Sequence, residues 1–377
     1  MKNTFRWSLE KKIKSSLSNN FGIENYDEYR FGNFNVINTT VPNFKNPALK
    51  LFQNLKPWIK KNTGYKLNHI VNSKISPIDN YSDKLQIIWE KLNKEGKELL
   101  VEIIAYRLLG FQKIKLATNN AKYWEALRKA ATLKNNNDTY DPHFLHFILY
   151  KFDLSEIGYN VKLYFRDSGI AIAFINEQYA YKLRNEYVVT VKEGDVVLDI
   201  GACWGDTALY FADKTGVNGK VYSFEFIPEN INLFEINRAL NPSHYNQIEL
   251  IKHPVSDVSG QTIFFKDNGP GSRIELEPFE EQTGSTTTLS IDDFVRQKRL
   301  TKIDFIKMDI EGSEPKALEG AIETIKKFRP KLAIAIYHSM DDLTNIPTWI
   351  SNLNLGYKLY VGHYTIHAEE TVLFAIC

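Results

Sequence analysis

Cysteine is scarce in this chain, which has two cysteines, Cys203 and Cys377, among 377 residues. Two thiols so far apart do not make a disulfide framework, and no stretch has the Cys and His spacing of a zinc site. A chain with free thiols and no disulfide scaffold is typical of a reducing compartment. We therefore expect a cytoplasmic protein.

The sequence also lacks long apolar runs and an excess of charge of either sign. No apolar stretch reaches the roughly 20 residues that span a membrane, and the first residues do not form a secretory signal. Lysine and arginine total 47 against 45 aspartate and glutamate residues, a net charge of +2. This balance gives no electrostatic basis for nucleic acid as a partner. At 43% hydrophobic and 24% charged residues, the composition is that of a globular protein.

The most informative stretch is the segment 196–212, VVLDIGACWGDTALYFA. A short apolar run ends in Asp199, two glycines follow at Gly201 and Gly205, and helical periodicity begins at Asp206. This order predicts a strand, a tight turn and the start of a helix. The helix N-terminus offers N–H groups and a positive dipole end to an anion, and Asp199 offers an acceptor beside them. The pair suits a ligand that carries both a carboxylate and an ammonium group.

The G-x-G-x-x-G spacing of nicotinamide-binding proteins is absent after Asp199, which argues against a dehydrogenase. The next predicted strand, 221–224, ends in Glu225, about twenty residues past the turn, where a carboxylate binds ribose hydroxyls. A third strand leads to Ser256 and Asp257, and Asp257 is placed to accept the exocyclic amine of adenine. Together these features predict S-adenosylmethionine as the ligand and S-adenosylhomocysteine as its product.

Strands and helices alternate after Glu225, which predicts an α/β fold. We expect a Rossmann-like, seven-stranded, mostly parallel sheet of the class I methyltransferase type, ending in a hairpin of the last two strands. Polar side chains lie in or directly after the fourth and fifth strands, at Lys307, Asp309, Glu311 and His338. Because the carboxyl ends of parallel strands meet at one edge, these side chains should line the acceptor side of the site.

His338 is the best single candidate for a general base, because an unperturbed imidazole titrates near neutral pH. The alternative is a structural histidine that bonds the end of a strand. Asp309, Glu311, His338 and His363 are ligand types for a divalent metal such as Mg²⁺. They have no compact spacing, however, and we expect a reaction without a metal.

The region before the glycine turn has two predicted parts. Residues 1–138 read as a mostly helical accessory domain without a catalytic constellation, open to homo-oligomerisation or acceptor binding. Residues 139–190 read as a β-hairpin over 161–174 and a helix over 177–187, leading into a donor-binding domain over 191–377.

Two details of the accessory domain carry alternatives. Leu9, Ile13 and Leu17 fall at helical spacing among lysines, which predicts a helix that docks on its own protein. A basic helix on a membrane surface is the alternative. The run NNND at 135–138 predicts a linker at the end of this domain.

Four segments carry a family resemblance: DIGACWGDTALYFA, VYSFEFIPENI, STTTLSIDDF, and IDFIKMDIEGSE followed by ALEGA. In this order and spacing they resemble the FkbM family of S-adenosylmethionine-dependent methyltransferases, over about residues 188–377. Many members are similar to O-methyltransferases that act on sugars or polyketides in polysaccharide and natural-product pathways. The resemblance therefore implies methyl transfer to a hydroxyl. Where the family has an acid after the fifth strand this chain has Tyr337 and His338, which leaves the base open.

These considerations define a set of candidate residues. For catalysis we expect His338, Asp309, Glu311 and Lys307. For donor binding we expect Asp199, Gly201, Ala202, Cys203, Gly205, Asp206, Thr207, Glu225, Phe226, Ser256, Asp257 and Asp309. Two other functions stay open: a non-catalytic module that binds S-adenosylmethionine or a nucleoside, and a methyltransferase that acts on nitrogen or another acceptor atom.

Overall fold

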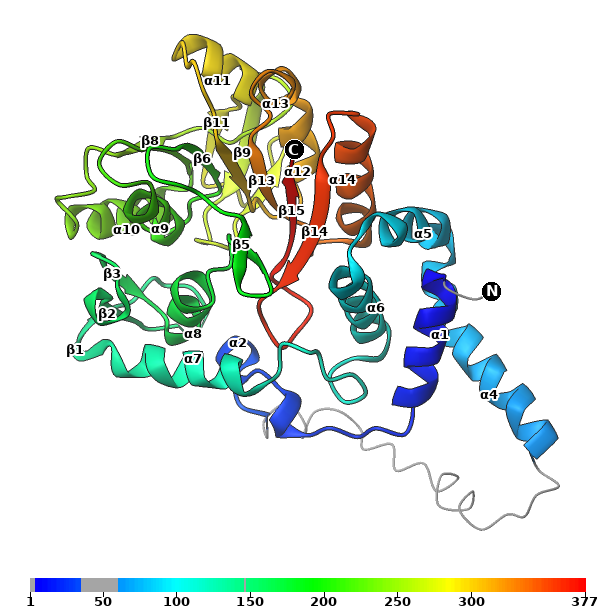
Figure 1. Cartoon of the computed structure of the whole chain (residues 1–377). Coiled ribbons are helices and arrows are strands. Elements are labelled where there is room, and N and C mark those ends of the chain that lie inside the picture. Colours follow the sequence, from blue (N-terminus) through cyan, green and yellow to red (C-terminus); the bar gives the residue numbers. More distant parts are fainter. Residues whose placement is uncertain (1–3, 35–59, 146) are drawn as a thin grey trace. The chain divides into compact units, whose positions relative to one another are not determined.

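The computed structural model describes residues 4–34, 60–145 and 147–377 (Figure 1). Its contacts divide the chain into two compact units. The helical unit comprises Met1–Asn119 together with Thr365–Glu369. The sheet unit comprises Asn120–Tyr364 together with Glu370–Cys377. The sequence had suggested one helical region up to residue 138, whereas the helix after Asn120 belongs to the sheet unit.

The sheet unit is built on a seven-stranded sheet in the order β14-β15-β13-β12-β6-β7-β8. β15 runs antiparallel to both of its neighbours, β13 and β14, and the other four pairings are parallel. This confirms the predicted class I methyltransferase sheet with its terminal hairpin. The strands are β6 (Val196–Ile200), β7 (Lys220–Phe224), β8 (Ile248–Ile251), β12 (Phe305–Met308), β13 (Lys331–Ala335), β14 (Lys358–His363) and β15 (Thr371–Ile376).

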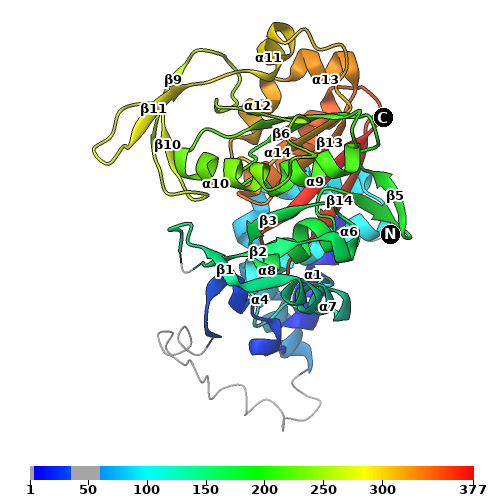
Figure 2. The same cartoon turned by 90° about the vertical axis from the view of Figure 1, so that its left-hand side faces the viewer.

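The central strands are apolar because helices cover both faces of the sheet. All four residues of β12 are buried, as are four of the five in β6, β7 and β13. Parallel strands buried on both faces read as continuous apolar runs, which is why the sequence located them. Figure 2 shows α9 and α10 on one face and α11 and α13 on the other. The helices are α9 (Asp206–Thr215), α10 (Pro228–Ala239), α11 (Ile291–Gln297), α12 (Glu314–Glu319), α13 (Ile322–Phe328) and α14 (Met340–Asn352).

Three smaller sheets complete the unit. They are the antiparallel sheet β1-β2-β3, the antiparallel sheet β10-β9-β11 and the pair β4-β5. Their bounds are β1 (Lys134–Tyr140), β2 (Leu149–Asp153), β3 (Lys162–Phe165), β4 (Tyr181–Leu183), β5 (Glu186–Val189), β9 (Thr262–Lys266), β10 (Arg273–Glu275) and β11 (Gly284–Thr287). The remaining helices of the unit are α7 (Ala121–Thr132), η5 (Ser155–Ile157), α8 (Asp167–Ile170) and η6 (Ala171–Ile175).

Three predictions for the region before the core are wrong. The second strand of the hairpin at 161–174 is helical, because α8 and η6 occupy it. A short apolar run that is buried on all sides has no period that distinguishes strand from helix. The helix predicted over 177–187 is the hairpin β4-β5, which turns at Arg184 and Asn185 with φ of 52° and 68°. The supposed linker at 135–138 lies within β1, a polar strand at a sheet edge.

The helical unit contains α1 (Phe5–Ser16), η1 (Ile23–Asn25), α2 (Glu28–Phe31), α4 (Lys60–Ile75), η4 (Ser76–Tyr81), α5 (Ser82–Lys91) and α6 (Lys94–Leu109). The apolar face of α1 is buried, with Phe5, Leu9 and Ile13 at most 2% exposed. The helix therefore docks on its own unit, and the membrane-surface alternative for it is wrong. No helix in the described ranges combines the length and hydropathy that a membrane crossing requires.

The loop between β14 and β15 supplies the last part of the helical unit. Glu369 accepts a hydrogen bond from Arg30 at 2.7 Å, and Thr118 donates to the carbonyl of Thr365. His367 Nε2 lies 3.5 Å from a carboxylate oxygen of Asp27. These polar contacts join the first hundred or so residues to five residues near position 367.

Candidate active site

The glycine turn after β6 lies directly against the end of β12. Gly201 has a φ of +84°, and a Cβ there would lie 2.0 Å from the carbonyl oxygen of Asp309. Gly205 has a φ of +85°, and a Cβ there would lie 3.0 Å from the ring of Phe234. Glycine is required at the first position by both the backbone conformation and the close approach of the neighbouring strand. The predicted turn is present and touches the segment that carries the acidic residues.

The other residues of the turn lead into α9. Ala202 N–H donates to the carbonyl of Phe224 at 2.9 Å, and Cys203 has a φ of +45°. Burial raises the pKa of the Cys203 thiol well above its ordinary value. Burial also raises the pKa of Asp206, the first residue of α9, to about 7, against the opposing effect of Lys307. The first N–H groups of α9 have no partner within the helix, so this turn presents donors to an anion.

Asp199 and Lys307 form a buried ion pair between adjacent strands. They are paired in register on β6 and β12, and their side chains are 0% and 2% exposed. Lys307 Nζ lies 3.2 Å from Asp199 Oδ1, and Thr207 Oγ1 donates to Asp199 Oδ2 at 2.9 Å. Burial lowers the pKa of Lys307, but three carboxylates, Asp199 foremost, outweigh it and raise that pKa. Lys307 is therefore a fixed cation that also donates to the carbonyls of Ile200 and Gly201.

Glu225 lies at the end of β7, where the sequence placed a ribose-binding acid. Its carboxylate accepts the N–H groups of Phe226 at 2.7 Å and Ile227 at 2.8 Å, and the side-chain amide of Asn230 at 3.2 Å. Burial raises the pKa of Glu225 to about 7, against these hydrogen bonds. The Asn230 amide is itself held by Trp204, whose indole N–H donates to it at 3.1 Å.

Ser256 and Asp257 follow β8 in a turn that packs closely against another segment. The Ser256 hydroxyl donates to Asp257 Oδ1 at 2.8 Å. A Cβ at Gly320 would lie 2.1 Å from the carbonyl oxygen of Ser256, so the turn is in close contact with the backbone at Gly320. The rings of Phe226 and Phe265 pack edge to face, with their centroids 5.6 Å apart. The turn is present as expected, and its role toward adenine stays a prediction.

Asp309 is the centre of a second polar group at the end of β12. The hydroxyls of Tyr179 and Tyr337 donate to its carboxylate at 2.9 Å and 3.0 Å. His338 Nε2 lies 3.2 Å from Asp309 Oδ1. Burial raises the pKa of Asp309, but His338 and Lys307 outweigh it, and the pKa stays below its ordinary value. Asp309 is therefore an ionised carboxylate that protein donors hold in one orientation.

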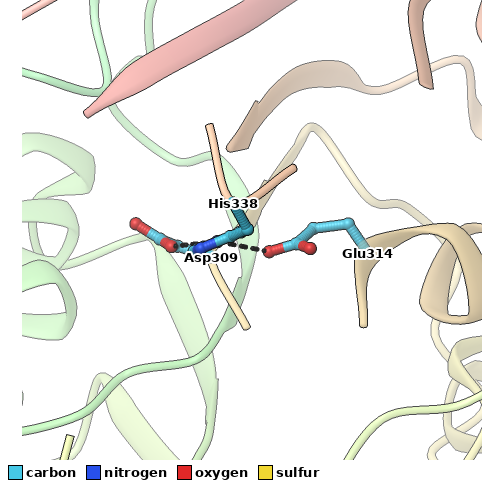
Figure 3. Close-up of side chains that lie close together, drawn as sticks. All are labelled: Asp309, Glu314 and His338. Atoms are coloured by element: carbon cyan, nitrogen blue, oxygen red, sulfur yellow. Dashed lines mark ion pairs between the residues drawn. The ribbon is translucent and has the colours of Figure 1, made fainter. Parts of the chain in front are cut away.

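Glu314, the first residue of α12, approaches His338 from the other side (Figure 3). Its side chain is 0% exposed, and its Oε1 lies 3.1 Å from His338 Nε2. The N–H of Ile310 donates to the same oxygen at 2.7 Å. Burial lowers the pKa of His338, but Asp309 and Glu314 outweigh it and raise that pKa to about 11. The imidazole thus lies between two carboxylates.

The structure brings together three of the four catalytic candidates, Lys307, Asp309 and His338. Glu311 reaches only the edge of this group, with a side chain that is 66% exposed and an oxygen 3.6 Å from His338 Nδ1. Sequence reasoning did not select Glu314, although its carboxylate is buried at the centre of this group. It missed Tyr179, which lies 130 positions before Asp309 and carries no local signal.

Comparisons with known proteins agree with this geometry. A model of the methyltransferase FkbM domain matches residues 199–359. The chain is 26% identical over 166 residues to the 2-O-methyltransferase NoeI of Sinorhizobium fredii (strain NBRC 101917 / NGR234), a match that covers 39% of this chain and 66% of that protein. The crystal structure of methyltransferase FkbM from Methylobacillus flagellatus KT has a TM-score of 0.50 and 18% identity, covering 81% of this chain and 61% of that one.

The chain thus matches just under two thirds of the length of each of these two proteins. At this identity the likeness to the crystal structure shows the fold alone, which is that of class I S-adenosylmethionine-dependent methyltransferases. The family match begins at Asp199 and includes the glycine turn, Glu225 and the Asp309 segment. Residues 199–359 of this chain therefore match the methyltransferase FkbM domain.

Proposed function

We propose that this protein is an S-adenosylmethionine-dependent methyltransferase that methylates a hydroxyl of a sugar, glycan or natural product. The observation that best supports this is the 2.0 Å separation that a Cβ at Gly201 would have from the carbonyl of Asp309. The glycine turn and the polar group around Asp309 therefore meet at one sheet edge. The curated relative is named a 2-O-methyltransferase, which favours an oxygen acceptor over nitrogen.

The residues around the glycine turn fit the donor in charge. The N–H groups at the start of α9 suit its carboxylate, and the Glu225 carboxylate suits the ribose hydroxyls. Asp199 is the predicted acceptor for its ammonium, although this carboxylate is already shared by Thr207 and Lys307. When bound, S-adenosylmethionine supplies an activated methyl group that leaves by in-line displacement.

On the acceptor side, the protein must orient a hydroxyl and take up its proton. Alignment of the reacting atoms can contribute about 7–11 kcal/mol, and a positioned base roughly 10²–10⁴-fold in rate. Tyr179 and Tyr337 hold the Asp309 carboxylate in place, and His338 lies beside it. Asp309 and Glu314 raise the pKa of His338 to about 11, so its imidazole is already protonated near neutral pH and does not act as the base. We therefore assign proton uptake to the Asp309 carboxylate, beside which His338 lies.

The direct test is to incubate the purified chain with isotopically labelled S-adenosylmethionine and a panel of nucleotide sugars and oligosaccharides. Mass analysis should find one labelled methyl group on an oxygen of one acceptor. Fragmentation separates an O-methyl from an N-methyl product. A methyl label found only on nitrogen would overturn the proposal that the acceptor is a hydroxyl.

Two variants separate an enzyme from a module that only binds the donor. Asp309→Asn and His338→Gln should each reduce turnover by about 10²-fold or more, and His338→Gln should leave affinity for S-adenosylhomocysteine within a few-fold. If neither variant changes binding or turnover, this edge of the sheet takes no part in catalysis.

A further inference from the structure

Three side chains at the centre of the polar group point their ligand atoms at one another. His338 Nε2 lies 3.2 Å from Asp309 Oδ1 and 3.1 Å from Glu314 Oε1. One ligand atom from each residue lies within 4.8 Å of the other two. Metal–ligand bonds of about 2.0–2.2 Å place neighbouring ligands of a six-coordinate ion about 2.8–3.1 Å apart. The two separations at His338 are close to that spacing.

The hydrogen bonds of these residues are incomplete. In the part of the chain that the structure describes, His338 Nε2 and Glu314 Oε2 are buried and have no hydrogen-bond partner. The side chains are only 10% and 0% exposed. A single N–H on Nε2 cannot serve two carboxylates at once, and a buried acceptor without a partner is unfavourable. A cation between the three ligand atoms would satisfy His338 Nε2, and bidentate binding by Glu314 would also satisfy its Oε2.

Surrounding groups hold the ligand residues in place. The Ile310 N–H donates to Glu314 Oε1, and the Tyr179 hydroxyl donates to Asp309 Oδ2 at 2.9 Å. Partners of this kind orient metal ligands and are a regular part of metal sites. They leave His338 Nε2 and one oxygen of each carboxylate turned toward the centre of the group, as Figure 3 shows.

Lys307 is a cation whose charge acts on Asp309. Its Nζ lies 3.2 Å from Asp199 Oδ1 and donates to two backbone carbonyls, so its charge is balanced on β6. Asp309 and Glu314 carry two negative charges against one imidazole. Metal binding requires His338 to release the proton that the two carboxylates otherwise stabilise on its imidazole. With that proton released, the group has the charge and the mixed oxygen and nitrogen donors that suit a divalent first-row transition ion.

We propose that Asp309, Glu314 and His338 bind one divalent transition-metal ion of the Mn²⁺ type. From spacing alone we expected no metal, because these residues are too scattered in the sequence to form a motif. Binding of the ion does not depend on the proposed function. Its role in methyl transfer does: a bound ion would lower the pKa of an acceptor hydroxyl and orient it toward the donor.

The test is a titration of the metal-depleted full chain with Mn²⁺ alone, without donor or acceptor. Loss of the free-ion electron paramagnetic resonance signal reports binding. We expect one Mn²⁺ per chain, and a loss of affinity of about 10–100-fold or more in Glu314→Gln and His338→Gln. The matched control is Glu319→Gln, which removes an exposed carboxylate from the same helix and should bind as the wild type does.

Circular dichroism of each variant shows whether it folds. If Glu314→Gln fails to fold, Co²⁺ binding to the wild-type chain is measured instead. The visible absorption spectrum of Co²⁺ should change on binding, and addition of Mn²⁺ should restore the spectrum of free Co²⁺. Absence of saturable Mn²⁺ binding in the wild type, or equal binding in Glu314→Gln and Glu319→Gln, would overturn the proposal and leave an imidazolium between two carboxylates.

Methyl transfer is then measured with and without chelation. Metal binding without methyl transfer to any acceptor would sink the proposed function and keep the metal site. Methyl transfer that survives chelation in a chain that binds no Mn²⁺ would support the proposed function and overturn the metal site.

Discussion

The contact between Gly201 and β12 predicts a large cost for one added methyl group. In Gly201→Ala, the positive φ alone costs about 1–2 kcal/mol. The new Cβ would also lie 2.0 Å from the carbonyl oxygen of Asp309, a backbone atom that cannot rotate away. Overpacking of this kind costs about 1–3 kcal/mol. The expected loss in the free energy of unfolding is therefore about 2–5 kcal/mol.

Gly194 provides the control, because its φ is +77° and no heavy atom lies within 4 Å of a Cβ placed there. Gly194→Ala should cost only the backbone term, about 1–2 kcal/mol. Urea unfolding followed by far-ultraviolet circular dichroism gives both losses from the shift in midpoint. Gly201→Ala should also weaken binding of S-adenosylhomocysteine measured by calorimetry, since the turn must move. Equal losses in the two variants would show that the turn does not touch β12 as described.

Two pH-dependent predictions of opposite sign follow from buried acids. Burial raises the pKa of Glu225 from 4.5 to about 7, so the folded state favours its protonated form and stability falls as pH rises between those values. Glu225→Gln should remove this dependence of the unfolding free energy on pH and stabilise the donor-free protein by up to about 3 kcal/mol at pH 8. It should also weaken donor binding. If the dependence of thermal unfolding on pH between 5 and 8 is the same in the variant, the prediction is wrong. Burial raises the pKa of Glu177, but Lys182 and Lys214 outweigh it and lower that pKa from 4.5 to about 2. The stability that Glu177 contributes is complete above about pH 4.5 and is lost as pH falls toward 2. Glu177→Gln should therefore cost about 1–3 kcal/mol of unfolding free energy at pH 7, after discounting for solvent screening, and nothing near pH 2. A cost that is the same at both pH values would refute the ionic cause.

The parts of the fold that the sequence predicted are those in which one local pattern has one physical cause. The run at 196–198, just before Asp199, is apolar because a central parallel strand is buried on both faces. Gly201 and Gly205 marked the turn because few other residues adopt a positive φ. The run at 170–174 is also apolar and buried, yet it is helical, and nothing in its composition separates the two states.

The candidate site divides in the same way. Residues that follow strand ends, such as Asp309 and His338, could be assigned to one edge because parallel strands align their carboxyl ends. Glu314 could not be assigned, since an acid at the first position of a helix has a sufficient local explanation in the helix dipole. Tyr179 comes from a loop before β4, and only the folded chain shows that its hydroxyl reaches Asp309.

The assignment of Thr365–Glu369 to the helical unit means that the two units are interleaved along the polypeptide. The hydrogen bond from Arg30 to Glu369 closes a separation of 339 positions. Closing so long a loop has an entropic cost, and contacts of this kind slow folding. A helical fragment cut out at Asn119 would lack His367 and Glu369, which contact Asp27 and Arg30. The segments around Arg30 and Glu369 must therefore meet before the helical unit has its full set of contacts.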